Sequence, residues 1–126
     1  MKRVGNLELY SSTDIKNLPD YEWLVDSIFP MTGVAMLFGE SRVGKSFLAL
    51  DLAVSISEGR SWFGYGVKKS EVIYIAAEAP SGMKNRIKAI ESHRQIEIPE
   101  NLVILRAPVD LNDDTAVDNL IDAIHE

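Results

Sequence analysis

The sequence contains no cysteine and only two histidines, His93 and His125, among its 126 residues. Without cysteine the chain can form neither disulfides nor thiolate metal ligands, and two histidines do not favour a structural zinc site. Small domains stabilised by disulfides or zinc are therefore excluded. The lack of cysteine also fits the reducing interior of a cell.

Long apolar runs are lacking as well. The longest uncharged stretch near the middle of the chain, residues 28–38, contains Pro30 and Gly33 and is shorter than the roughly 20 residues of a membrane-spanning helix. Lys2 and Arg3 are followed by polar residues and not by the apolar core of a signal peptide. With 46% hydrophobic and 25% charged residues, the composition predicts a soluble, globular, cytoplasmic protein without membrane association.

Basic charge is missing from the C-terminal part, which has no Lys or Arg from Ala107 onward, and the net charge is −6. The composition therefore predicts no broad basic surface for nucleic acid. A local basic patch on one predicted helix remains possible, and its ordinary alternative is a solvated helix face. The residues of this patch are Lys84, Arg86, Lys88 and Arg94.

A glycine-containing loop organises the chain. Residues 39–46 match the pattern G-x-x-x-x-G-K-S, after an apolar run at 34–38 that predicts a buried strand. Gly39 and Gly44 allow the loop to curl, so that its N–H groups point toward one phosphate, and the following helix adds its positive N-terminal end. We expect the phosphates of a nucleotide to lie against Gly39, Glu40, Ser41, Arg42, Val43, Gly44, Lys45, Ser46 and Phe47.

Two residues of this loop carry the expected chemistry. The ammonium group of Lys45 can follow the β- and γ-phosphates of ATP, which makes it a candidate catalytic residue. The hydroxyl group of Ser46 suits Mg²⁺, which prefers hard oxygen ligands. A turn that matches the pattern by chance is the alternative, but the apolar run before it and the helix signal after it favour nucleotide binding.

The remaining elements predict an α/β fold. Apolar strands are expected at 71–77 and 102–105, and helices after residues 46, 82 and 114, so that a mostly parallel sheet lies between two helical layers. Residues 1–20 are expected to be a flexible lead-in in which Ser11–Asp14 can cap a short helical turn, and residues 21–126 the domain.

We expect Trp23 to pack in the core. The aromatic loop at 62–66 can stack a base or close over a helix end.

Glu78 follows the second predicted strand, at the sheet edge where ligands of such folds bind. A carboxylate there can orient and deprotonate a water molecule aimed at the γ-phosphate. It can equally cap the helix after Ser81 or remain solvated. The residues alone do not decide between these roles.

Three segments together resemble a known family. The loop at 39–46, Gly59–Gly64, and Val72–Glu78 followed by Arg86 are similar to the RepA-type branch of RecA-like P-loop ATPases, which is related to DnaB-type replicative helicases, and we expect the chain to group with AAA-type ATPases. The resemblance covers roughly residues 21 to 106. It implies a three-layer αβα fold that binds ATP and Mg²⁺, with Glu78 as general base.

The resemblance also implies a homo-oligomeric ring, possibly of six subunits, that acts on single-stranded DNA. An arginine from the neighbouring subunit completes such sites, and the sequence assigns that role to neither Arg42 nor Arg86. The family continues into a Walker B strand whose Asp helps to hold Mg²⁺, and we expect this chain to end before that strand and to hydrolyse ATP weakly. A nucleotide-dependent assembly module and, less favoured, a small-molecule kinase are the alternatives.

Overall fold

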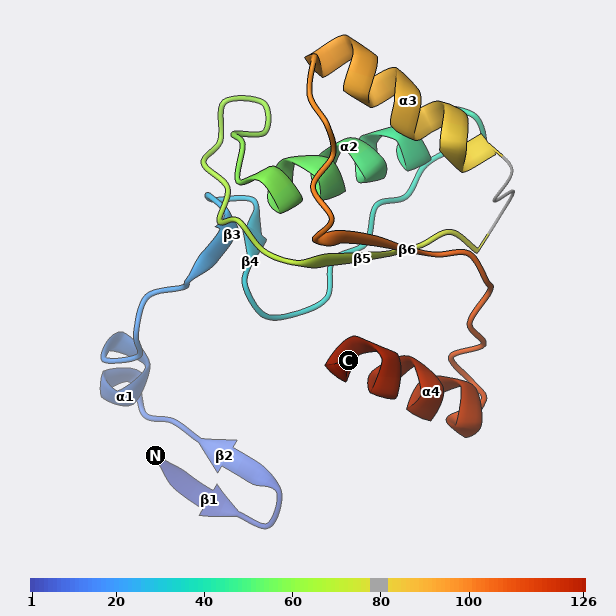
Figure 1. Cartoon of the computed structure of the whole chain (residues 1–126). Coiled ribbons are helices and arrows are strands. Elements are labelled where there is room, and N and C mark those ends of the chain that lie inside the picture. Colours follow the sequence, from blue (N-terminus) through green and yellow to red (C-terminus); the bar gives the residue numbers. More distant parts are fainter. Residues whose placement is uncertain (78–81) are drawn as a thin grey trace.

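The computed structural model, shown in Figure 1, describes residues 1–77 and 82–126. The first part of the chain forms two antiparallel hairpins with a short helix between them. The second part alternates helices and strands. In order, the elements are β1 (Lys2–Val4), β2 (Leu7–Leu9), α1 (Ser12–Lys16), β3 (Trp23–Val25), β4 (Phe29–Pro30), α2 (Lys45–Glu58), β5 (Val72–Ile75), α3 (Met83–Arg94), β6 (Leu102–Leu105) and α4 (Asp114–His125).

The sheet at the centre of the second part is the parallel pair β5 and β6, in register from Val72 opposite Leu102 to Ile75 opposite Leu105. Figure 1 shows α2 and α3 on one face of this pair and α4 on the other. Helices on both faces are what parallel strands require, because each crossover places its helix against the sheet. The predicted α/β class with its layer order is confirmed.

The hydrophobic core lies between α2, the sheet and α3. Leu50 and Val54 of α2 are fully buried, and they belong to clusters that include Met83 of α3 and Leu102 of β6. The helix ends where the sequence predicts, because Gly59 adopts the left-handed conformation (φ 69°) and its N–H group bonds to the carbonyls of Ile56 and Ser55. Burial of this face therefore fixes the helix that follows the glycine loop.

The prediction of a buried strand at residues 34–38 is wrong for this structure. The segment has no regular secondary structure, Val34 is fully exposed and Phe38 is 84% exposed. The physical reason is that no strand in the described residues pairs with it, so its apolar side chains lack a covering layer. Burial of β5 is also only partial, because Ile73 and Ile75 remain exposed on one side.

The aromatic residue expected in the core lies near the surface instead. Trp23 is 37% exposed, and its ring lies 6.0 Å from that of Tyr21. Val25, two residues later on the same strand, is fully buried in its place. The strand that contains both residues, β3, pairs with β4 in an antiparallel hairpin.

The N-terminal segment contains more structure than the flexible lead-in that was expected. Gly5, in the left-handed region, joins β1 to β2, and Ser11 caps α1 through reciprocal hydrogen bonds with Asp14. The expected capped turn is therefore confirmed, whereas the boundary at residue 20 stays a prediction. No helix within residues 1–77 and 82–126 is both long enough and apolar enough to cross a membrane.

Candidate functional site

The glycine loop turns sharply into α2. Gly44 precedes the helix in the left-handed conformation (φ 96°), which a residue with a Cβ adopts only at a cost, and Arg42 also has a positive φ of 63°. No side chain in the described part of the chain caps the start of α2 by a hydrogen bond. The N–H groups of its first turn are thus free of side-chain acceptors, and such a helix end favours an anion.

The side chain of Lys45 folds back over the loop. Its ammonium group donates a hydrogen bond of 2.8 Å to the carbonyl oxygen of Gly39 and another to the carbonyl oxygen of Glu40. Within the described residues it forms no ion pair with a carboxylate. Both of its partners among the described residues are neutral carbonyls, which do not compensate its positive charge.

A cavity of about 620 Å³, which we call the loop hollow, lies beside the glycine loop. Its walls come from the loop, the first turn of α2 and one residue of α3. Among the described residues that line it, three are basic and none is acidic, so this part of the lining suits a polyanion such as a triphosphate. The lining residues are Ser41, Arg42, Gly44, Lys45, Ser46, Phe47 and Arg86. The structure therefore brings together six of the nine predicted loop residues, whereas Gly39, Glu40 and Val43 lie outside the lining.

Arg86 also lines the loop hollow, although the sequence alone did not assign it to the phosphate site. Its guanidinium group lies over the ring of Phe47, 4.8 Å from the centroid, in a cation–π arrangement. The sequence contains a signal for this position: Arg86 is three residues after Met83 and four before Ile90, which places it at the edge of the apolar stripe of α3. The contact directs a positive charge toward the loop.

Arg94 does not belong to the predicted basic surface. Its side chain is only 12% exposed and donates hydrogen bonds to Ser55 Oγ (3.1 Å), to Glu58 Oε2 (3.4 Å) and to the carboxylate of Asp51. It follows Ile90 by four residues and so continues the apolar stripe of α3, which explains why it faces α2. Of the predicted patch, Lys84 and Lys88 remain exposed.

The expected general base, Glu78, lies outside the described residues, as does Ser81. Within residues 1–77 and 82–126 no group of three or more His, Asp or Glu side chains is placed to hold a metal ion. Ser46 lines the loop hollow, where its hydroxyl group can contribute one oxygen ligand to Mg²⁺. Such a site suits Mg²⁺ carried by a nucleotide, because this ion is held largely by phosphates and water.

The aromatic loop lies away from the loop hollow. Trp62 is half-buried, packs near Phe29 with a ring separation of 6.2 Å, and donates a 3.1 Å hydrogen bond from Nε1 to Asp51. Phe63 is 72% exposed. Trp62 therefore packs against the middle of α2, and neither ring is among the described residues that line the loop hollow.

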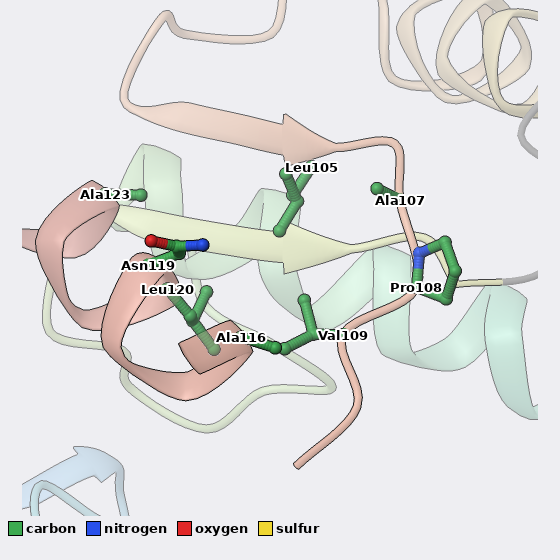
Figure 2. Close-up of a pocket in the computed structure, with 8 residues that line it drawn as sticks. All are labelled: Leu105, Ala107, Pro108, Val109, Ala116, Asn119, Leu120 and Ala123. Carbon is green, nitrogen blue, oxygen red and sulfur yellow. The ribbon is translucent and has the colours of Figure 1, made fainter. Parts of the chain in front are cut away.

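A second cavity differs from the loop hollow in that its lining is mostly apolar. Figure 2 shows the space of about 250 Å³ between the end of β6 and α4, where Leu105 and Val109 lie near Ala116 and Leu120. Among the described residues that line it, Asn119 is the one polar residue and none is charged. This cavity therefore lacks the cationic side chains that line the loop hollow.

Comparison with known families finds a match that covers most of the chain. A family model described as an AAA domain matches residues 7–126, a range that includes the loop, α2 and every element up to α4. No curated protein and no solved structure matches the chain.

Proposed function

The chain belongs to the AAA domain family, and from this premise we propose that its glycine loop binds the triphosphate of ATP together with Mg²⁺. Family membership gives a P-loop NTPase domain, for which nucleotide binding and ATPase chemistry are the general expectation. Because one fold can serve several functions, the argument for this chain rests on its site.

The observation that carries the proposal is the composition of the loop hollow. Among the described residues, the cationic groups of Arg42, Lys45 and Arg86 line it and no acidic side chain does. The left-handed Gly44 starts α2 beside them, and no described side chain caps the first turn by a hydrogen bond. Positive side chains combined with a free helix N-terminus form an anion site of the size and charge that polyphosphates need.

Each residue then has a proposed role. Lys45 exchanges its carbonyl partners for the β- and γ-phosphate oxygens, and the backbone of residues 39–44 surrounds the β-phosphate. Ser46 supplies a hydroxyl ligand to Mg²⁺, which neutralises phosphate charge when bound. Arg86 contacts the phosphates from within the same chain, a role supported by its position over Phe47 at the wall of the loop hollow.

For hydrolysis, we propose that Glu78 accepts a proton from the water that attacks the γ-phosphate. The resemblance to RepA-type ATPases supports this role, which in that family belongs to the Glu after the second strand.

The wider role proposed is that of a cytoplasmic RecA-like ATPase that forms a ring and acts on single-stranded DNA as a helicase or replication protein. The resemblance of the three sequence segments supports it. The second candidate is a nucleotide-dependent assembly module without turnover. The exposed apolar side chains at residues 34–38 favour this candidate, because such surfaces associate.

Titration calorimetry with ATP and ADP, with and without Mg²⁺, tests nucleotide binding. Wild type should bind both, and Lys45→Ala should lower the affinity about 10- to 100-fold, since charge-assisted hydrogen bonds contribute about 1.5–3 kcal/mol. Lys84→Ala, which removes an exposed lysine outside the loop hollow, is the matched control. Equal effects of the two substitutions, or no binding by the wild type, would contradict the proposal.

Phosphate release distinguishes the two wider roles. Turnover that Glu78→Gln abolishes supports the ATPase. ATP-dependent assembly without phosphate release supports the assembly module.

A further inference from the structure

Two arginines of α3 contact α2 at different points along its length. Near the start of α2, Arg86 lies over the ring of Phe47. Farther along, Arg94 bonds to Asp51, Ser55 and Glu58. Figure 1 shows α2 and α3 side by side on the same face of the sheet, running in the same direction.

The spacing of these contacts is matched on the two helices. Arg86 and Arg94 are eight residues apart, and so are Phe47 and Ser55, their partners on α2. Eight helical residues rise about 12 Å, so both contacts form together at one axial register of the two helices. Met83, Ile87 and Ile90 are apolar and tolerate some sliding, whereas directed hydrogen bonds do not.

The contacts of Arg94 fix this register more tightly than apolar packing does. A guanidinium group donates in a rigid planar fork, and here its two terminal nitrogens reach groups on three residues of α2. Arg94 and Glu58 are each only 12% exposed, so solvent cannot readily replace these partners. Misplacing a buried, paired charge carries a large cost.

Asp51 is itself held in place. One carboxylate oxygen accepts from Arg94 and the other accepts a 3.1 Å hydrogen bond from Trp62 Nε1. The carboxylate therefore cannot follow a displaced α3 without breaking its bond to the aromatic loop. The position of α3 along α2 is thereby tied also to the aromatic loop at 62–66.

We infer that Arg94 is a positioning residue for nucleotide binding, because it holds α3 in the register that places Arg86 at the loop hollow. This inference rests on the proposed function. Arg94 lines no part of the loop hollow, and its effect on the nucleotide passes through Arg86. Arg94→Lys retains the positive charge but loses the fork, so it loosens the register.

A double-mutant cycle measured as ATP affinity tests this. Arg94→Lys should weaken ATP binding about three- to tenfold in the wild-type background and should change it little in the Arg86→Ala background. Lys88→Arg, a charge-preserving exchange at an exposed position of the same helix, is the matched control and should leave affinity unchanged. Thermal unfolding of each variant checks that it is folded.

The double-mutant cycle distinguishes a positioning role of Arg94 in nucleotide binding from a role in stability alone. An equal loss of affinity in both backgrounds, or no loss from Arg94→Lys, would overturn the inference and leave the proposed function standing. Absence of ATP binding by the wild type would overturn both. Should Arg94→Lys fail to fold, Asp51→Asn weakens the same ion pair, keeps an oxygen acceptor for Trp62 and gives the same cycle.

Discussion

Arg86 and Phe47 join the two helices beside the glycine loop: the guanidinium carbon lies 4.8 Å from the ring centroid. Phe47 is the third residue of α2, and Arg86 is in the first half of α3. A cation–π contact at a partly exposed site contributes about 0.5–1 kcal/mol, enough to bias the position of the side chain without locking it. The contact therefore favours a position of Arg86 beside the loop hollow and leaves the side chain some freedom.

Replacing the ring tests this relationship. Phe47→Leu keeps an apolar side chain but removes the π face, so Arg86 is held less well at the loop hollow, and ATP affinity should fall about two- to fivefold, as loss of a contact of this strength predicts. Titration calorimetry measures the change. Phe63→Leu removes an exposed ring away from the loop hollow and should have no effect, and an equal loss from both variants would refute the link.

The two glycines of the loop should respond differently to alanine. Gly44 has φ 96° and a Cβ there would meet no atom within 4 Å, so Gly44→Ala costs backbone strain alone, about 1–2 kcal/mol of unfolding free energy. At Gly39 a Cβ would make ordinary contacts at 3.6 and 3.7 Å, and its φ is not left-handed, so the cost should be below about 0.5 kcal/mol. Urea unfolding compares them, and a larger cost at Gly39 would contradict the loop geometry.

The N-terminal helix should be sensitive to acid. The Ser11 backbone N–H and hydroxyl group, and then the N-terminal ammonium group, hold the pKa of Asp14 below its ordinary value of 3.8. A lowered pKa in the folded state means that the carboxylate stabilises α1 fully above the ordinary pKa, and that this contribution is lost as the pH falls through the folded value.

NMR titration of Asp14 checks this expectation. Ser11→Ala removes the hydroxyl donor but leaves the backbone N–H bond, so the midpoint should rise part of the way toward the ordinary value. Ser12→Ala, at the neighbouring position without a bond to Asp14 in the structure, serves as the control. An unchanged midpoint in Ser11→Ala would show that the cap does not set the pKa.

The exposed apolar segment should cause self-association. Val34, Met36 and Phe38 present apolar surface with no covering layer, and such patches associate in water. Sedimentation velocity should show species larger than a monomer as concentration rises, and Met36→Glu should reduce them. Leu7→Glu, on the exposed strand β2, is the control. A monomer at high concentration would rule out this prediction.

Local signals in the sequence predicted most of the fold. The apolar periodicity and capping residues predicted α2, α3 and α4, and β-branched runs predicted β5 and β6, because these elements depend on neighbours close in the chain. The segment at 34–38 was different. Its residues favour a strand, but a strand needs a hydrogen-bonded neighbour, and local sequence does not say whether one is present.

The loop part of the site was also predictable, because its motif combines backbone freedom and charge within eight residues. The positions of Arg86 and Arg94 were not assigned, since composition marks both simply as basic residues on a helix. Their helical spacing from the apolar residues Met83 and Ile90 indicates that both arginines face α2. Their actual partners, Phe47 and Asp51, depend on how two helices pack, which no local pattern specifies.

The hydrogen bonds from Lys45 to the carbonyl oxygens of Gly39 and Glu40 have a kinetic consequence. They tie the end of the loop to its beginning, so the backbone keeps its curvature before any anion arrives. An incoming phosphate group need not wait for a disorder-to-order transition. One side chain has to swing, a motion on the picosecond-to-nanosecond timescale, so association should be limited by diffusion and orientation.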